Sequence, residues 1–348
     1  MGATGDSRSG GSGLMPQFPM TQYLGSKRRL VKWILSYTPN CTSVLDAFSG
    51  SGVVAYAYKQ QGKRVIANDL LTSSYFFAKA TVENNHVRLS DDEIERLFTP
   101  HSYRQSYIEQ HYVGVLYPAE ECRFLDNLYA NISELDDPYK RSIALAAAVR
   151  TCVYKMPGGK FRPNLLPYRS PEHPYHKPKF QKPIEDVYRS FLLAYNAAVF
   201  NNRQANLALN ADTLDIVSTI QVDVAYFDPP YGGSDYDYLR DYFFVELYSR
   251  HYGQMYEFSG EVKRYEESRH SGFRLISEVH SSFQTLFERA AHIPCWVVSY
   301  NNRSRPSKRE LTDLIRIFKP DITVVEQDYA YKSGNNDRLR EYLFVCRS

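Results

Sequence analysis

The sequence is poor in several features that define whole classes of protein. It has five cysteines in 348 residues and no C-x-x-C pair, which excludes a disulfide framework or a zinc cluster and is typical of a reducing cytosol. No stretch approaches the ~18 uncharged apolar residues that cross a bilayer. The net charge is only +3, which by itself predicts no partner. Hydrophobic residues make up 43% and charged residues 23%, so the chain is globular, with one large domain or two.

The first fourteen residues differ sharply in composition from the residues that follow them. Residues 1–14 are rich in glycine and serine and lack the apolar run of a signal peptide, so we expect a flexible leader, with Met15 and Met20 as candidate natural starts. Beyond them, short apolar runs at 43–48 and 64–69 flank a helical stretch at 53–59. Strand, glycine turn, helix and strand in that order predict a βαβ unit.

The middle of the chain differs in its sequence pattern from the βαβ segment before it. Residues 86–150 look helical, and the composition then changes at 151–190, which holds seven prolines and eight Lys/Arg against three acidic residues. So many prolines exclude a regular helix through the first two-thirds of that stretch. Strand candidates return at four places: 206–212, 222–228, 295–300 and 342–345. We therefore predict an α/β sheet domain formed by 15–85 and 206–348, interrupted by an insert at 86–205.

The first motif that carries chemistry is a glycine loop directly after the first predicted strand. It reads Asp46-Ala-Phe48-Ser-Gly50-Ser-Gly52, and its glycines allow a tight turn and a close approach to a ligand. Asp69 ends the next strand, at an offset where an acid commonly accepts hydrogen bonds from a ribose. A carboxylate at Asp46 repels a pyrophosphate and suits an ammonium group. The pair of acids favours a ligand with a ribose and a positive charge over an ordinary βα turn.

The second motif is Asp228-Pro229-Pro230-Tyr231, which ends an apolar strand. Two prolines fix φ and remove two N–H donors, so the turn is rigid and presents carbonyl acceptors. With a carboxylate and a flat ring beside them, these acceptors suit the exocyclic amine of a planar base. The alternative is a rigid Pro-Pro turn with a structural role only. The residues that follow could line a base pocket or begin a helix, and we favour the helix for most of them: Asp235, Tyr236, Tyr238 and Tyr242.

Together, the two motifs resemble the amino-methyltransferases of DNA that use S-adenosylmethionine. The segment 22–27 resembles the family's N-terminal cofactor motif, and the large insert between the glycine loop and Asp-Pro-Pro-Tyr gives the order of the Dam-like (class alpha) adenine-N6 methyltransferases. Weaker likenesses occur at 154–163 and at 299–302. The resemblance implies a Rossmann-like methyltransferase sheet with a mixed helical and loop target-recognition insert.

The family also implies roles for individual residues. Asp228 and the Pro229 carbonyl would hold the target amine, next to Pro230, with Tyr231 stacked on a base swung out of the duplex. The cofactor S-adenosylmethionine would contact a larger set: Tyr23, Gly25, Lys27, Asp46, Phe48, Gly50, Gly52, Asp69 and Asp212. Within it, Lys27 would hold the methionine carboxylate, Asp69 the ribose and Asp212 the adenine amine of the cofactor.

The basic insert is the candidate DNA contact, because Lys and Arg neutralise phosphates and Arg also pairs with guanine. A solvated loop is the alternative for any single residue. The candidates are Lys155, Lys160, Arg162, Arg169, Lys177 and Lys179. His173 and His176 have the spacing of a metal pair, but no third ligand is evident, so no metal is expected.

The resemblance implies double-stranded DNA as substrate, a possible cognate restriction endonuclease as partner, and action in a bacterial cytoplasm. Asp at 228 favours adenine, because cytosine-directed relatives usually have Ser there and protein glutamine methyltransferases Asn. Methylation of RNA adenine or of a cytosine amine remains an alternative. So does a non-catalytic DNA-binding or partner subunit that keeps the fold, although both motifs are intact.

Overall fold

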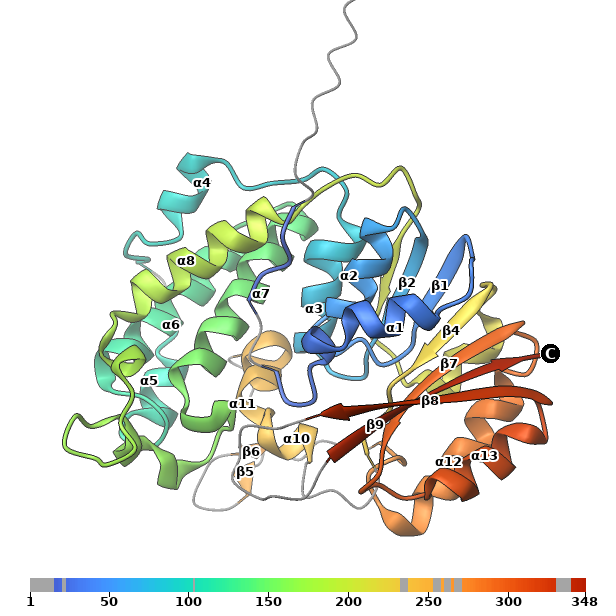
Figure 1. Ribbon diagram of the computed structural model, residues 1–348. Coiled ribbons are helices and arrows are strands. Elements are labelled where there is room, and N and C mark those ends of the chain that lie inside the picture. The colour runs from blue at the N-terminus through green and yellow to red at the C-terminus, as the bar shows by residue number, and fades with distance from the viewer. Residues whose placement is uncertain are drawn as a thin grey trace, which may run out of the picture.

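A computed structural model describes residues 16–20, 23–102, 104–231, 237–252, 258–259, 264–265, 271–329 and 339–348. The expected leader at 1–14, Met15, Asp235 and Tyr236 lie outside these residues. The described chain forms a twisted sheet with helices on both faces and a separate group of helices beside it (Figure 1).

The central sheet has seven strands in the order β3-β2-β1-β4-β7-β9-β8. The first five are parallel to one another, and β9 runs antiparallel to both of its neighbours. Because β2 lies on one side of β1 and β4 on the other, the chain reverses its direction of winding between β1 and β4. The bounds are β1 (Ser43–Asp46), β2 (Arg64–Asn68), β3 (Leu207–Leu209), β4 (Val224–Phe227), β7 (Cys295–Asn301), β8 (Asp321–Tyr329) and β9 (Leu339–Arg347).

Helices cover both faces of this sheet. One core contains the apolar side chains of α1 (Val31–Tyr37) and α2 (Val53–Gln60) packed on β1, β2 and β4. The other contains α12 (Ile276–Arg289) and α13 (Lys308–Arg316), packed on the opposite face. The central strands β1, β4 and β7 are buried on both faces, as the continuous apolar runs in the sequence indicate. Two short helices flank the sheet as well: α3 (Thr72–Ala78) and α9 (Thr213–Ile216).

A helical lobe occupies the chain between β2 and β3. Its helices are α4 (Asp91–Arg96), α5 (Tyr107–Tyr112), α6 (Ala119–Ser133), α7 (Pro138–Lys155) and α8 (Ile184–Ala197). Their core also takes in α11 (Phe243–Glu246), which follows β4 after the short α10 (Tyr238–Asp241). The lobe is therefore built from two separate parts of the chain, and it lies beside the sheet (Figure 1).

Local sequence explains where the helices of the lobe begin and end. The Asp137 side chain accepts hydrogen bonds from the N–H groups of Tyr139 and Lys140, and Pro138 occupies the first position of α7. After α7 the prolines allow only short 3₁₀ turns, until α8 begins directly behind Pro183. The predicted helices, the proline-rich break and all six predicted strands are confirmed. The sequence reading missed the edge strand β8 and the short antiparallel pair β5 (Phe258–Ser259) and β6 (Arg264–Tyr265).

Candidate functional site

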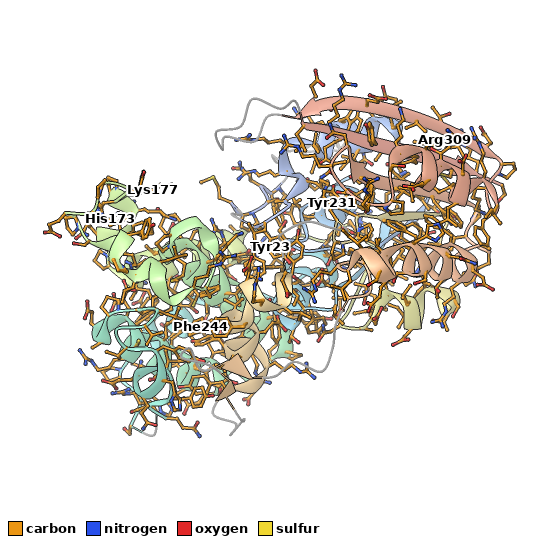
Figure 2. The ribbon with its side chains drawn as sticks, turned by 90° about the horizontal axis from the view of Figure 1, so that it is seen from below. Tyr23, His173, Lys177, Tyr231, Phe244 and Arg309 are labelled. Carbon is orange, nitrogen blue, oxygen red and sulfur yellow. The ribbon has the colours of Figure 1, made fainter. Side chains whose placement is uncertain are left out.

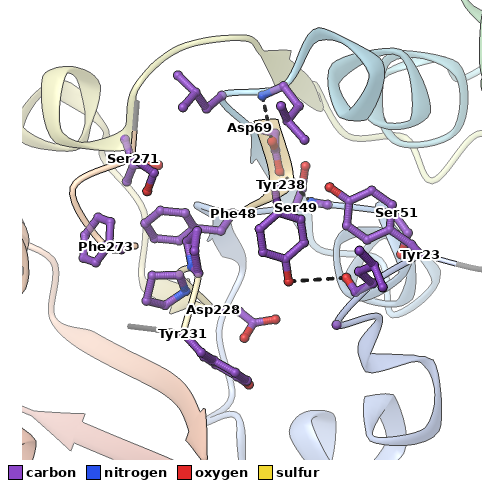
Figure 3. A pocket seen from close by; sticks show the side chains of 18 of the residues that line it. Tyr23, Phe48, Ser49, Ser51, Asp69, Asp228, Tyr231, Tyr238, Ser271 and Phe273 are labelled. Atoms are coloured by element: carbon purple, nitrogen blue, oxygen red, sulfur yellow. Dashed lines mark hydrogen bonds between the residues drawn. The ribbon is translucent and has the colours of Figure 1, made fainter. Parts of the chain in front are cut away.

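The motif residues meet at the carboxyl end of the parallel strands, at the point where the winding reverses. This is where ligands bind in open α/β sheets. A cavity of about 380 Å³ opens there (Figure 3). Its lining includes Tyr23, Gly25, Lys27, Asp46, Phe48, Gly50, Asp69, Asp212, Asp228, Pro229, Pro230 and Tyr231. Of the residues expected to hold the cofactor or the target base, only Gly52 is not part of the lining. It has φ +78° and directly precedes α2, so it shapes the turn.

The glycine loop and Asp69 form one hydrogen-bonded unit. The N–H of Gly50 donates to Asp69 Oδ2 at 2.7 Å, and the N–H of Leu71 donates to Oδ1 at 2.9 Å. Gly50 has φ +50°, and a Cβ there would lie 3.1 Å from the ring of Tyr23. A side chain at this position would therefore be strained and would press on the cavity wall. These contacts hold the carboxylate of Asp69 against the loop, at the edge of the cavity.

Asp46 is a buried carboxylate with an unsatisfied oxygen. Its Oδ2 accepts from the N–H of Ala55 at 3.0 Å, while its Oδ1 has no hydrogen-bond partner among the described residues. Burial raises the pKa of Asp46 well above its ordinary value, and the nearby charges of Asp228 and Asp69 raise it further. An acceptor that lines a cavity under these conditions suits a positively charged hydrogen-bond donor.

The segment from Tyr23 to Lys27 forms the wall that faces the helical lobe. The ring of Tyr23 stacks on that of Tyr242, with centres 5.0 Å apart. The N–H of Leu24 donates to the hydroxyl of Tyr242 at 2.8 Å. Gly25 has φ +74°, and a Cβ there would lie 2.8 Å from the hydroxyl of Tyr238. The wall is thus held by tyrosines that follow the Asp-Pro-Pro-Tyr turn.

Lys27 and Asp228 form a buried ion pair, with Nζ and Oδ1 2.7 Å apart. Burial raises the pKa of Asp228, and the ammonium group of Lys27 opposes that rise. Lys27 Nζ also lies 4.8 Å from the centre of the Tyr231 ring. The same cation therefore neutralises the carboxylate and contacts the aromatic ring of the turn, which lie side by side in Figure 3.

Several residues of the site were missed by the sequence reading. Tyr231 donates a hydrogen bond from its hydroxyl to Glu341 Oε2 at 2.9 Å, and its ring meets that of Tyr300 edge-on at 5.2 Å. Phe273 lies edge-on against Phe48 in the same cavity. Glu341 lies one residue before the predicted strand at 342–345. Tyr300 ends the predicted strand at 295–300 and lies in the weaker family likeness at 299–302, whereas Phe273 comes from a position with no motif around it.

The basic residues of the insert have different surroundings. Lys155 Nζ and Arg169 Nη2 both contact Glu121 Oε1 at 2.6 Å, inside the lobe. Both side chains are buried, so their predicted role in DNA contact is wrong: they neutralise a buried carboxylate. Lys179 is partly buried, with its Nζ donating to the Tyr154 carbonyl, and burial together with neighbouring cations lowers its pKa to about 8.

Three basic residues remain at the surface or close to it. Lys160 and Arg162 approach Asp241 at 3.4 and 3.1 Å, and the side chain of Arg162 is 41% exposed. Lys177 is exposed, and it lies with His173 at the outer end of the lobe, away from Tyr231 (Figure 2). These three, with the partly buried Lys179, remain candidates for contact with a polyanion.

The described residues lack two further features. They contain no group of three or more His, Cys, Asp and Glu side chains that could hold a metal ion. Among the helices described, none has the length and apolar character needed to cross a membrane.

Comparison with known proteins decides the family. Residues 23–296 match the model of the D12 class N6 adenine-specific DNA methyltransferases, which covers most of the chain. The chain belongs to this family. The predictions of the family, the fold class and the reaction are therefore confirmed: it is a DNA methyltransferase of N6 adenine specificity.

Curated relatives of this methyltransferase come from restriction–modification systems. It is 30% identical to the type II methyltransferase M2.HphI of Haemophilus parahaemolyticus, over 96% of its own length and 99% of that protein. It is 26% identical to the modification methylase StsI of Streptococcus sanguinis and 25% identical to the type II methyltransferase M.FokI of Planomicrobium okeanokoites. It covers 52% and 48% of these last two proteins. Methyltransferases of this family generally use S-adenosylmethionine.

Proposed function

We propose that the cavity at the carboxyl end of the sheet binds S-adenosylmethionine and that the adjoining turn 228–231 takes an adenine swung out of duplex DNA. The observation that carries the proposal is that the glycine loop and the Asp-Pro-Pro-Tyr turn, about 180 residues apart in the sequence, line one cavity. When bound, the cofactor supplies a methyl group on a positively charged sulfur, which a nitrogen lone pair can attack.

The residues around the cavity fit this cofactor. Asp46 offers a buried oxygen that lacks a partner among the described residues, which suits the ammonium group of the methionine moiety. Asp69 lies at the edge of the cavity, where a carboxylate suits ribose hydroxyls, because each carboxylate oxygen can accept more than one hydrogen bond. Asp212 caps α9 with one oxygen and lines the cavity, where the adenine of the cofactor would lie. Gly50 and Gly25 keep the walls free of side chains that would fill the cradle.

Lys27 is proposed to serve two acceptors. An ammonium group has three N–H donors, so it can hold Asp228 and also the carboxylate of the methionine moiety. Its contact with Asp228 Oδ1 opposes the rise in the pKa of Asp228 that burial causes, and so favours the ionised carboxylate. An ionised Asp228 is an acceptor only, and this is the state that the target amine requires.

The turn itself would hold the base. Asp228 and the Pro229 carbonyl accept the two N–H bonds of the adenine amine, which draws the nitrogen lone pair away from the ring and toward the methyl group. Two prolines fix these acceptors before the base arrives, and such positioning lowers the barrier to transfer. Tyr231 would stack on the base, and stacking of about 1–3 kcal/mol offsets part of the few kcal/mol that extrusion costs.

DNA would run along the side of the cavity that the helical lobe faces. Lys160, Arg162, Lys177 and Lys179 are the proposed phosphate contacts, with target recognition by the segment 86–205 and catalysis by 15–85 and 206–348. Since Arg162 and Lys160 already approach Asp241, a phosphate would exchange one anionic partner for another. A cognate restriction endonuclease is the proposed partner in a bacterial cytoplasm, because relatives such as M.FokI belong to such systems.

The test is transfer of a labelled methyl group to unmethylated duplex DNA, followed by digestion and separation of the nucleosides. Label is expected in N6-methyladenine. An Asp228→Ala variant should lose transfer yet still bind the cofactor, because Asp228 faces the base. Label in a cytosine, or a preference for structured RNA when both substrates compete, would contradict the proposal. Sequencing DNA from cells that express the protein would give the modified sequence.

A further inference from the structure

The hydroxyl group of Tyr231 is hydrogen-bonded to a buried carboxylate of the protein. It donates to Glu341 Oε2 at 2.9 Å. Glu341 lies on β9, opposite Asn301 of β7, and its side chain is buried with 1% of its surface exposed. A bond across 110 positions of the chain thus joins the C-terminal strand to the turn that would hold the base.

Burying the carboxylate of Glu341 in the interior of a strand costs free energy. Leu343, Phe344 and Val345, which follow it on β9, are all buried and apolar, and an apolar side chain of similar size would bury at lower cost. Burial raises the pKa of Glu341 to about 7, Lys27 opposes that rise and Asp228 adds to it. Its Oε1 has no hydrogen-bond partner among the described residues. The contact with Tyr231 is therefore what this carboxylate supplies.

The anchor acts on the free end of the ring. The orientation of a tyrosine ring is set by two side-chain torsions, and a bond at the hydroxyl restricts both. At the other end the backbone is fixed by Pro229 and Pro230, and the ring of Tyr300 packs edge-on at 5.2 Å. With its two ends held, the plane of the Tyr231 ring is set before a base arrives.

We propose that Glu341 is a positioning residue, which orients Tyr231 so that the target base is stacked with its amine against Asp228. The inference rests on the proposed function, because only a planar substrate makes the angle of the ring matter. The carboxylate acts as a hydrogen-bond acceptor and not through its charge.

The experiment is a double-mutant cycle with Glu341→Leu, Tyr231→Phe and the two combined. The readouts are the rate of methyl transfer in a single turnover, with cofactor and DNA saturating, and the cofactor Kd. The duplex carries the sequence mapped beforehand in cells. Each single change is expected to slow transfer by about tenfold, the value of one hydrogen bond, and the combination by about tenfold and not a hundredfold. The cofactor Kd and the Tm should stay close to the wild-type values.

Glu341→Gln is the matched control, because its amide oxygen still accepts from Tyr231 while its charge is gone. It should retain most of the wild-type rate. A second readout is fluorescence of 2-aminopurine in place of the target adenine. Its fluorescence should be quenched less in Glu341→Leu than in the wild type, since stacking on Tyr231 is looser.

Four results would overturn the inference. The first is a wild-type rate of transfer in Tyr231→Phe or in Glu341→Leu. The second is a hundredfold loss of that rate in the double variant. The third is a Glu341→Gln variant that is as slow as Glu341→Leu. The fourth is a loss of rate that follows a loss of cofactor affinity or Tm. If Glu341→Leu does not fold, Tyr231→Phe and Glu341→Gln still decide. If the wild-type protein does not methylate adenine, the proposed function itself is wrong, whatever the variants show.

Discussion

The ion pair between Lys27 and Asp228 makes a specific demand on the pH dependence of the reaction. Replacing Lys27 with Met removes the cation 2.7 Å from the Asp228 carboxylate, in a pocket where both side chains are largely buried. An opposite charge within ~4–6 Å lowers the pKa of an acid by about 1–3 units, so its loss allows the pKa of Asp228 to rise by that amount.

The sign follows from the role of the carboxylate. Ionised Asp228 accepts from the amine, whereas the protonated acid presents an O–H group toward it. Activity is therefore lost as the pH falls through the pKa of Asp228. In Lys27→Met this acid limb should move to higher pH by about 1–3 units. We expect cofactor affinity to fall as well, by about tenfold or more, since a charged hydrogen bond to the cofactor carboxylate is lost.

The assay is the single-turnover rate against pH, with cofactor saturating at every pH so that weaker binding does not enter. Lys27→Arg is the matched control, because it keeps the charge and should keep the limb near its wild-type position. Asp228→Asn keeps an acceptor oxygen that does not titrate. When Lys27→Met is combined with Asp228→Asn, the pH profile should show no shift of an acid limb. An acid limb that stays in place in Lys27→Met alone would refute the role given to the ion pair.

Other outcomes follow from single contacts. Gly50→Ala should weaken cofactor binding, whereas Gly62→Ala, equally strained at φ +77° but with nothing within 4 Å of its Cβ, should lower only the Tm. Hydrogen bonds lower the pKa of Asp223, so its stabilisation is present above the unfolded pKa of about 3.9 and is lost as the pH falls through the folded one. Asp223→Asn should therefore cost stability to urea at pH 7, by about 1–3 kcal/mol, and much less near pH 2. Lys177→Ala should weaken DNA binding and reduce its salt slope by about one, whereas Lys155→Met should lower the Tm instead.

The sequence was sufficient for the sheet and the two motifs because their signals are local. Apolar runs at 43–48 and 222–228 are long enough to be buried strands, and an acid lies at the end of each strand: Asp46 ends β1 and Asp228 follows β4. Parallel strands bring their carboxyl ends to one edge, so Asp46, Asp69 and Asp228 had to lie near one another once the strands were assigned. Glycine and proline then restrict the turns between them.

The surroundings of charged residues in the insert could not be obtained in this way. Composition gives the number of cations at 151–190 but not the side to which each points. Arg169 lies inside because Glu121, 48 positions earlier, is buried on α6 and requires a partner. Similarly, Glu341 reads as an ordinary polar residue at a strand end until the antiparallel pairing of β9 with β7 places it beside Tyr231. Both contacts depend on tertiary packing.

The helical lobe and the cofactor wall are parts of one structure, which bears on how DNA contact reaches the chemistry. Arg162 approaches Asp241, and the next residue, Tyr242, accepts a hydrogen bond from Leu24 in the cofactor wall. Four residues further along, Glu246 accepts from the N–H groups that begin α3, just after the loop of Asp69. A phosphate that draws Arg162 from Asp241 would therefore act on the segment that holds both walls. Because α11 packs in the core of the helical lobe, we expect removal of 86–205 to expose that core and to lower the Tm of the remaining protein.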